Sequence, residues 1–393
     1  MSKSMVFVFL VIFSTACFAE ETQKDFRPQF LREKIEFFYL DPNPTAAKEI
    51  IQDAKNLRWL EGFPGVFTAF ARHYPNEIVN WAQQAEVSFE QHPHLIEALY
   101  MGGLQGEAIQ LGLKAQLPAQ TILSFGSRPR SFLTAPVNFS GSIQYLCCHF
   151  FISGDARYGK RIIDVLELTP RQVANPDELK ELKNQAKTVL QELIFKHDRI
   201  YHLCIEEAKT RTGYSQAVLN QLLDQQHRAQ KEAFSTQNGL LSAVIVITDD
   251  TSFEEQWANL PAMEGPIHRS ISSIPYPDTP EETKIIRIYL IFNGYELDKD
   301  LNAHLTYDME ILDPTGAKIV DFHDLPALKR KVPGRFFLQM ADQPMALAFE
   351  ADGSQANENN PTGTCIINAT LQDHLSKKNL KLTTTFEVVP PEK

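Results

Sequence analysis

The sequence predicts an α-then-β protein, with an all-helical half followed by an antiparallel β half. Three observations predict this order. Apolar residues recur at steps of three and four from about residue 26 to about residue 234, which is the helical period. Around Ser235 that period ends, and in the later part of the chain apolar and polar residues alternate one by one. With 393 residues, the chain is also long enough for two or more domains.

Residues 1–19 are predicted to be a cleaved secretory signal peptide. Lys3 supplies the basic start, residues 6–13 form an uncharged apolar run, and Ala19 is a small residue that suits cleavage. The run is too short to span a bilayer, which needs about 20 apolar residues. We therefore expect a periplasmic or secreted protein. The alternative is a lipoprotein anchored through Cys17, which follows the small residue Ala16.

Residues 26–234 are predicted to form the helical domain. In residues 45–60 the apolar positions are spaced as one helix face, and Pro44 and Thr45 supply a helix start. The same reasoning places helices at residues 66–73, 76–89, 95–104, 143–152, 156–168, 176–195 and 201–209. Short helices with short turns resemble an irregular, tetratricopeptide-like helical repeat. No clean 34-residue repeat is found, so a plain helical bundle is the alternative.

Residues 235–390 are predicted to form an immunoglobulin-like antiparallel β-sandwich. Strict alternation places strands at residues 303–311, 365–371 and 380–388, and further strands are expected at residues 240–247, 285–292, 336–339 and 345–349. Asp313, Pro314 and Gly316 predict a turn. The Cys, Trp and Cys pattern of true immunoglobulin domains is absent, so the prediction covers architecture alone.

Four cysteines remain after the signal peptide, namely Cys147, Cys148, Cys204 and Cys365. An oxidising compartment permits a disulfide, and Cys147 or Cys148 could pair with Cys204; Cys148–Cys204 is the candidate bridge. The alternative is a set of buried free thiols.

No motif in the sequence assigns catalytic, cofactor-binding or metal-binding residues. The zinc-hydrolase, nucleophile-elbow and phosphate-loop patterns are missing, although this does not exclude an enzyme because catalytic triads assemble from distant positions. His92 and His94 lack a third metal ligand and are expected in a solvated turn. Cys147, Cys148 and His149 lie in an apolar segment and are expected to be buried packing residues.

Two polar clusters in the sequence have features of binding sites. Asp298, Asp300 and Asn302 have the spacing that opens a calcium loop, but Ala303 and Met309 break the pattern, so a charged hairpin loop is expected. The net charge of −11 makes nucleic acid and anionic lipid poor partners. Within this acidic chain one basic cluster could hold an anion or an acidic partner, although an exposed loop is the more ordinary interpretation; its members are Lys329, Arg330, Lys331 and Arg335.

Two passages resemble a sparsely described group of exported Gram-negative bacterial proteins. The first runs from residue 150 to residue 168 and includes Gly154, Asp155, Arg161, Ile162, Ile163, Asp164 and Leu166. The second is later and includes Phe292, Gly294, Tyr307, Asp308, Asp313, Pro314, Gly316, Gly363, Asp373 and Phe386. The resemblance implies a helical half followed by a sandwich half and a bacterial exported setting. It assigns no catalytic residues.

Two functions are compatible with these features. The first hypothesis is a non-enzymatic binding or assembly protein of the bacterial envelope or exterior, whose helical and β-sandwich faces contact a protein or peptide partner. The second is an exported hydrolase with its site in the helical half and the sandwich as an accessory module. Convergent titratable groups with shifted pKa values would favour the enzyme, whereas an apolar groove would favour the binding protein.

Overall fold

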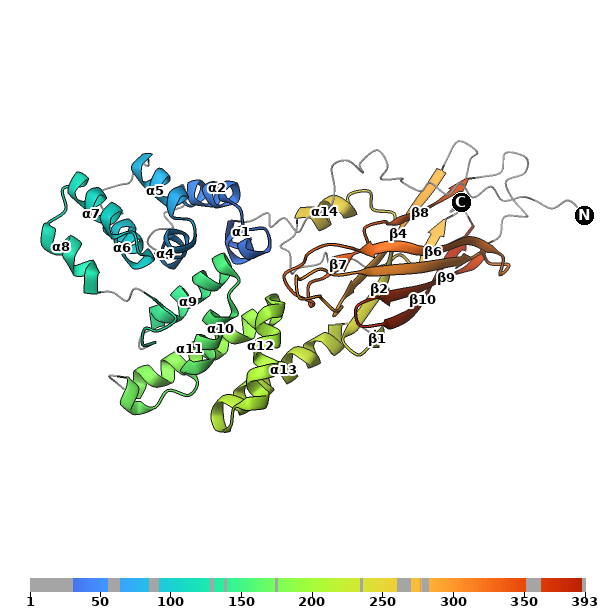
Figure 1. Cartoon of the computed structure of the whole chain (residues 1–393). Coiled ribbons are helices and arrows are strands. Elements are labelled where there is room, and N and C mark those ends of the chain that lie inside the picture. Colours follow the sequence, from blue (N-terminus) through green and yellow to red (C-terminus); the bar gives the residue numbers. More distant parts are fainter. Residues whose placement is uncertain are drawn as a thin grey trace, which may run out of the picture. The chain divides into compact units, whose positions relative to one another are not determined.

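The computed structural model describes residues 31–55, 64–84, 92–127, 131–137, 140–173, 176–233, 236–259, 270–275, 277, 283–350 and 362–390. These residues divide after Gln226 into two compact units, which we call the helical unit and the β unit. Helices come first and strands second (Figure 1), which confirms the predicted α-then-β order. The boundary lies inside a helix rather than at the change of period near residue 235. The expected signal peptide, with Cys17, lies outside the described residues.

The helical unit contains short helices joined by tight turns. Its α-helices are α1 (Leu31–Glu36), α2 (Pro44–Lys55), α4 (Pro64–His73), α5 (Pro75–Gln84), α6 (His92–Gly102), α7 (Gln105–Lys114), α8 (Ala119–Ser124), α9 (Ser140–Ser153), α10 (Ala156–Val165), α11 (Pro176–Lys196), α12 (Asp198–Thr210) and α13 (Gly213–Ala233). Short 3₁₀ turns lie at Phe38–Leu40, Phe125–Ser127 and Pro170–Gln172. The predicted helices are found with shifted ends, while α1, α7, α8 and α13 had no predicted range.

Local sequence explains where several of these helices begin. Helices α2, α4, α5 and α11 start at a proline, whose fixed φ suits the first helical position. Asp155 is the N-cap of α10, and its carboxylate accepts a hydrogen bond from the Arg157 amide at 2.9 Å. From this cap onward α10 buries one face, which includes Tyr158, Ile162 and Ile163. The N-cap and the buried face therefore both favour a helix that begins at Ala156.

Helix α4 is central to the packing of the helical unit. It contacts α6 on one side and α9 on another, and α9 also contacts α1. A Cβ at Gly102 of α6 would lie 2.3 Å from the Cβ of Ala71, so glycine permits the close approach of α4 and α6. In a simple solenoid each repeat touches only its sequence neighbours. The contact of α4 with α9 therefore favours the bundle alternative over a regular repeat.

The described strands of the β unit form two five-stranded sheets. The first contains β1 (Thr236–Asn238), β2 (Leu241–Thr248) and β4 (Thr283–Asn293), with β7 (Gln339–Met340) and β8 (Met345–Glu350) both paired to β4. The second has the order β3 (Ser273–Pro275), β10 (Lys378–Val389), β9 (Gly363–Asp373), β5 (Leu305–Leu312) and β6 (Lys318–Leu328). The described pairs are antiparallel except β3 with β10. Helix α14 (Phe253–Asn259) follows β2.

Alternation identified the central strands of the second sheet correctly. Strand β5 alternates buried and half-buried residues along its whole length, and buried Tyr307 lies opposite buried Leu371 of β9. The turn after β5 is also as predicted, because Asp313 accepts hydrogen bonds from the amides of Thr315 at 2.8 Å and Ala317 at 2.9 Å. The immunoglobulin-like sandwich stays a prediction.

Two strand predictions need correction. The strand expected at residues 336–339 is reduced to β7, because Phe336 and Phe337 lie buried in a turn in which the Phe337 amide bonds the Gly334 carbonyl. Strand β6 was not predicted at all. It lies at the edge of its sheet, and β-bulges interrupt its pairing with β5.

Candidate functional site

A pocket of about 240 Å³ lies within the helical unit, among α1, α4, α9 and α11. Most of its lining is apolar, and a few polar side chains interrupt the apolar wall. The apolar residues are Ile35, Val66, Ile143, Cys147, Cys148, Phe151, Val189 and Leu193, and the polar ones are Arg32, Glu36, Gln144, Gln185 and Glu192. An apolar cavity with few polar groups is the usual form of a ligand site.

The periodicity of two helices explains how the pocket is built. On α11, Gln185, Val189 and Glu192 are four and three residues apart and so share one helix face. Helix α9 is buried along nearly its whole length, so its residues Ile143 and Cys147 can line the pocket while others pack against α4 and α10. The sequence pattern showed both helices. It could not show that α1, which contributes Arg32 and Glu36, lies against them.

The charged groups at the pocket are paired with one another. Nζ of Lys196 lies 3.0 Å from Glu36 and 2.8 Å from Glu192. Glu192 also accepts a hydrogen bond from Arg32 at 3.0 Å. The side chains of Lys196 and Arg32 therefore neutralise the carboxylates of Glu36 and Glu192.

A buried series of polar side chains continues from Glu36 away from Lys196. Nε2 of His197 lies 3.5 Å from the Glu36 carboxylate, and Nδ1 of His197 lies 3.0 Å from the Tyr39 hydroxyl. Because a carboxylate only accepts, the proton of the neutral imidazole lies on Nε2, so Nδ1 accepts from Tyr39. The imidazole is fully buried and packs against Phe150 and Phe151.

Burial and the neighbouring charged groups shift the pKa values of Glu36 and His197 in opposite directions. Burial raises the pKa of Glu36, but hydrogen bonding from His197 and the charge of Lys196 outweigh it and hold the pKa below its usual value. Burial lowers the pKa of His197 despite the neighbouring Glu36 carboxylate. At neutral pH Glu36 is therefore ionised and His197 is neutral. Since His197 has no exposed surface, it cannot contact a substrate.

The thiols at the pocket are not nucleophiles. Burial raises the pKa of Cys147 well above its usual value and that of Cys148 to about 12, so both are protonated at neutral pH. His149, the neighbouring side chain that could serve as a base, has its pKa lowered to about 3, mainly by burial, and its ring stacks on Tyr158 at 5.0 Å. The packing interpretation of this segment is therefore the one that the geometry favours.

The expected disulfide is not formed. Cys147, Cys148, Cys204 and Cys365 are all free and buried. The Cys148 sulfur is directed at α4, where it would lie 3.0 Å from a Cβ at Gly65, whereas Cys204 is on α12. A disulfide needs Cβ atoms that point toward one another, about 4 Å apart. Of the two alternatives that the sequence left open, the structure therefore shows buried free thiols and no Cys148–Cys204 bridge, since the Cys148 sulfur faces α4.

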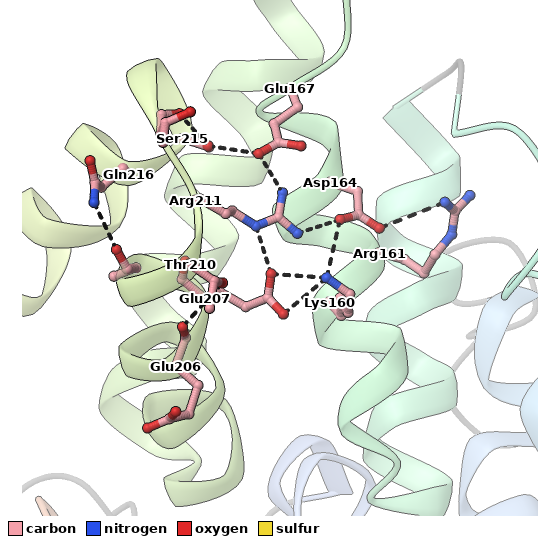
Figure 2. Close-up of polar contacts among 12 residues, drawn as sticks. Lys160, Arg161, Asp164, Glu167, Glu206, Glu207, Thr210, Arg211, Ser215 and Gln216 are labelled. Atoms are coloured by element: carbon pink, nitrogen blue, oxygen red, sulfur yellow. Dashed lines mark hydrogen bonds and ion pairs between the residues drawn. The ribbon is translucent and has the colours of Figure 1, made fainter.

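A second polar cluster in the helical unit is structural. Figure 2 shows Arg211 between Asp164, Glu167 and Glu207. The Arg211 side chain is 8% exposed, and Lys160 reaches Glu207 from α10 at 2.9 Å. Ionic hydrogen bonds thus join α10, the segment after it and the end of α12. Because every carboxylate faces a cation, the cluster offers no group for an acid–base reaction.

The predicted basic cluster is divided by the structure. Arg335 is 5% exposed and forms two hydrogen bonds to Glu296, at 3.0 and 2.9 Å. Arg330 bonds Asp342 and donates to Gln339 at 2.8 Å. Lys329 and Lys331 are exposed. The four residues therefore do not form one continuous patch, because both arginines are used in internal contacts while Lys329 and Lys331 are exposed, as the loop interpretation expects for the lysines.

The predicted loop at Asp298 is stabilised by its own hydrogen bonds, whereas His92 and His94 lie in the first turn of α6 and not in the solvated turn that was expected. The Asp298 carboxylate accepts hydrogen bonds from the amides of Asp300 at 2.8 Å and Asn302 at 2.9 Å, which stabilises the turn. His94 is half-buried near the start of α6, which begins at His92 rather than after it. Across the described part of the chain, no three His, Cys, Asp or Glu side chains are placed to hold a metal ion. None of the described helices is long and apolar enough to cross a membrane.

Comparisons with known proteins leave the family open. No protein-family model matches the sequence, and no curated protein matches it. One solved structure with some likeness is a family 123 glycoside hydrolase from Clostridium perfringens, described for glycolipid glycan hydrolysis. The identity is 10% and the TM-score is 0.20, and the match covers 38% of this chain and 27% of that chain. A likeness of this size carries no argument about fold or function.

Proposed function

We propose that the protein is a non-enzymatic binding protein of the bacterial envelope or exterior, and that its helical unit receives an apolar side chain of a protein partner. The observation that carries this proposal is the apolar pocket among α1, α4, α9 and α11. A preformed apolar pocket holds a partner side chain by removing its surface from water, which contributes about 25 cal/mol for each Å² buried.

The chemistry around the pocket supports binding over hydrolysis. The Cys147 thiol is protonated, and the His197 imidazole is sealed from solvent. Glu36 is held ionised by Lys196, so it is a poor proton donor. The described lining thus offers an apolar surface without a nucleophile and base in reach of each other.

The surface of the helical unit offers further apolar contact area. Leu113 of α7 is 63% exposed, and Leu123 of α8 is 66% exposed. The two helices contact each other. Both leucines add exposed apolar surface to the helical unit, which a protein partner could cover.

The proposal is tested by filling the pocket. Val189 lines it, so Val189→Trp would occupy the space that a partner side chain needs. Thr188→Trp is the matched control, because Thr188 is the preceding residue of α11 and is exposed. Mature chains of both variants and of the native sequence would be immobilised and incubated with envelope and culture fractions, and the retained proteins would be quantified.

We expect one protein to be retained by the native chain and by Thr188→Trp, and at least ten-fold less of it by Val189→Trp. Equal retention by all three chains would contradict the pocket as the binding site. Cleavage of a hydrolase substrate panel by the native chain, lost in Val189→Trp, would support the hydrolase alternative instead.

A further inference from the structure

The composition and charge of the pocket identify the kind of side chain that it can accept. We propose that its occupant is the indole of a tryptophan presented by the partner, with the indole N–H donating to Gln185. This rests on the proposed function, and it specifies which chemical group enters the pocket. Three independent features of the pocket support it, namely its size, its charge balance and one unsatisfied acceptor.

The volume favours a bicyclic ring. An apolar cavity of about 150 Å³ is enough to bind benzene. The pocket here is about 240 Å³, so it has room for more than one six-membered ring. Its walls include Ile35, Val66 and Phe151, which match the apolar faces of an aromatic group. A single phenyl ring would leave part of the wall without contact, and each unfilled gap loses dispersion energy.

The charge balance favours a neutral occupant. Glu36 and Glu192 are the acidic groups of the lining, and both already bond Lys196, while Arg32 bonds Glu192. A carboxylate or ammonium entering the pocket would have to displace one of these pairs or remain unpaired in an apolar site. Either outcome is costly, because a desolvated charge needs a partner. Indole has no charge and disturbs none of the pairs.

The remaining acceptor selects an N–H donor. Gln185 lines the pocket, and its buried Oε1 has no hydrogen-bond partner among the described residues. A buried acceptor without a donor destabilises the empty site, so a ligand that supplies a donor gains more than the bond alone. Indole carries exactly one donor and no acceptor, which matches this single requirement. A phenylalanine side chain would leave Gln185 unsatisfied.

The test uses three small ligands of nearly the same shape. Indole has the N–H, indene has the same two fused rings without it, and indole-5-carboxylate adds a negative charge. Binding of each to the native mature chain would be measured by isothermal titration calorimetry. We expect indole to bind about five-fold more tightly than indene, as one net hydrogen bond requires, and indole-5-carboxylate to bind at least ten-fold more weakly than indole.

Two variants connect these differences to the structure. Gln185→Leu keeps the side-chain size and removes the acceptor, so indole and indene should bind it equally. Val189→Trp should abolish binding of both, and Thr188→Trp should leave it unchanged. An indole preference that persists in Gln185→Leu, or equal binding of the carboxylate, would overturn the indole assignment. So would the absence of binding by all three ligands.

Failure of this inference can be told apart from failure of the proposed function. If the indole series fails while Val189→Trp still loses the retained partner, the pocket binds a protein through another side chain. If indole binds as expected while partner retention is the same in Val189→Trp and Thr188→Trp, the ligand class stands and the proposed function is wrong.

Discussion

Tyr39 and His197 are 158 residues apart in the sequence, yet the Tyr39 hydroxyl lies 3.0 Å from Nδ1 of His197. This bond fixes the imidazole so that Nε2 faces Glu36, one of the pocket residues. The segment after α1 is thereby attached to the junction of α11 and α12. The pocket exists because these three parts of the chain are held together.

Replacing Tyr39 by Phe should destabilise the helical unit by about 1–2 kcal/mol, because Nδ1 of His197 would be left buried without a donor. Tyr100→Phe is the matched control. Tyr100 is also buried, but its hydroxyl makes no side-chain hydrogen bond among the described residues, so its loss should cost less than about 0.5 kcal/mol. Urea unfolding followed by circular dichroism at pH 7 measures both. Equal costs would show that the Tyr39 bond is not stabilising.

Acid should destabilise the helical unit through His149. Its pKa is about 3 in the folded chain, below the usual 6.5, chiefly because the ring is buried and secondarily because His73 and Arg72 lie near it. Tyr158 and Phe132 pack against the ring and supply no counter-charge. Between these two pH values the unfolded chain binds a proton that the folded chain does not. Stability is therefore complete above pH 6.5 and decreases as the pH falls toward 3.

His149→Phe should remove this dependence, because a phenyl ring fits the aromatic surroundings and does not titrate. We expect the variant to be more stable than the native chain at pH 5 by on the order of 2 kcal/mol. Melting temperatures of the native chain and of His149→Phe, measured between pH 4 and 8, would show whether the decrease in stability with falling pH is lost in the variant. A native-like acid transition in His149→Phe would contradict the assignment.

The burial of Arg211 predicts a large cost for its removal. Arg211→Met removes the buried guanidinium that joins Asp164, Glu167 and Glu207, although Lys160 still pairs with Glu207 at 2.9 Å. Because these carboxylates keep Lys160 or partial access to water, we expect a loss of about 1–3 kcal/mol in the free energy of unfolding. Lys209→Met on the same helix is the control, because Lys209 and its partner Glu206 are both more than 60% exposed. That surface pair should contribute less than about 1 kcal/mol. Similar losses in the two variants would mean that the Arg211 cluster acts as an ordinary surface network.

In the β unit, replacing Arg335 should lower the free energy of unfolding more than replacing Lys331, although both belong to the basic cluster of the sequence. Arg335→Ala removes a guanidinium that is 5% exposed and that donates two hydrogen bonds to Glu296. Because the Glu296 side chain is itself 37% exposed and can be solvated, we expect a loss of about 1–2 kcal/mol in the free energy of unfolding. Lys331→Ala should change stability by less than about 0.5 kcal/mol, because Lys331 is exposed. Guanidinium unfolding of the two variants measures this difference. A neutral Arg335→Ala would restore the idea that this side chain serves an external ligand.

The sequence predicts well what depends on local period, and poorly what depends on distant packing. Strands β5, β9 and β10 could be found because one face of each is buried and the other is not. Strand β6 could not, since its edge position tolerates polar residues on both faces and a positive φ of 54° at Asp324 interrupts its alternation. Helix α7 was not predicted from the sequence, because glycine is a poor helix former and α7 contains Gly112. The structure explains this glycine by packing, since a Cβ there would lie 2.5 Å from Ile122.

The candidate site depends on distant packing even more than the strands do, so the sequence predicts it less well. Each helix around the pocket except α1 was predicted, yet the pairing of Glu36 with Lys196 joins residues 160 apart. No spacing rule connects such positions in a single sequence. The candidate bridge between Cys148 and Cys204 is absent for a related reason. Cys148 and Cys204 lie in helices that were both predicted, but the direction of each sulfur depends on how those helices rotate against their neighbours.

The free thiols lead to the last prediction. If Cys147, Cys148, Cys204 and Cys365 are unpaired, the melting temperature of the purified chain should be the same with and without dithiothreitol. A disulfide across the helical unit would instead stabilise the folded state by about 2–4 kcal/mol, and reduction would lower the melting temperature by several degrees. Because all four thiols are buried, iodoacetamide should modify them slowly in the native chain and completely in guanidinium. Fewer than four modified thiols in unreduced, denatured protein would show that a bridge forms after all.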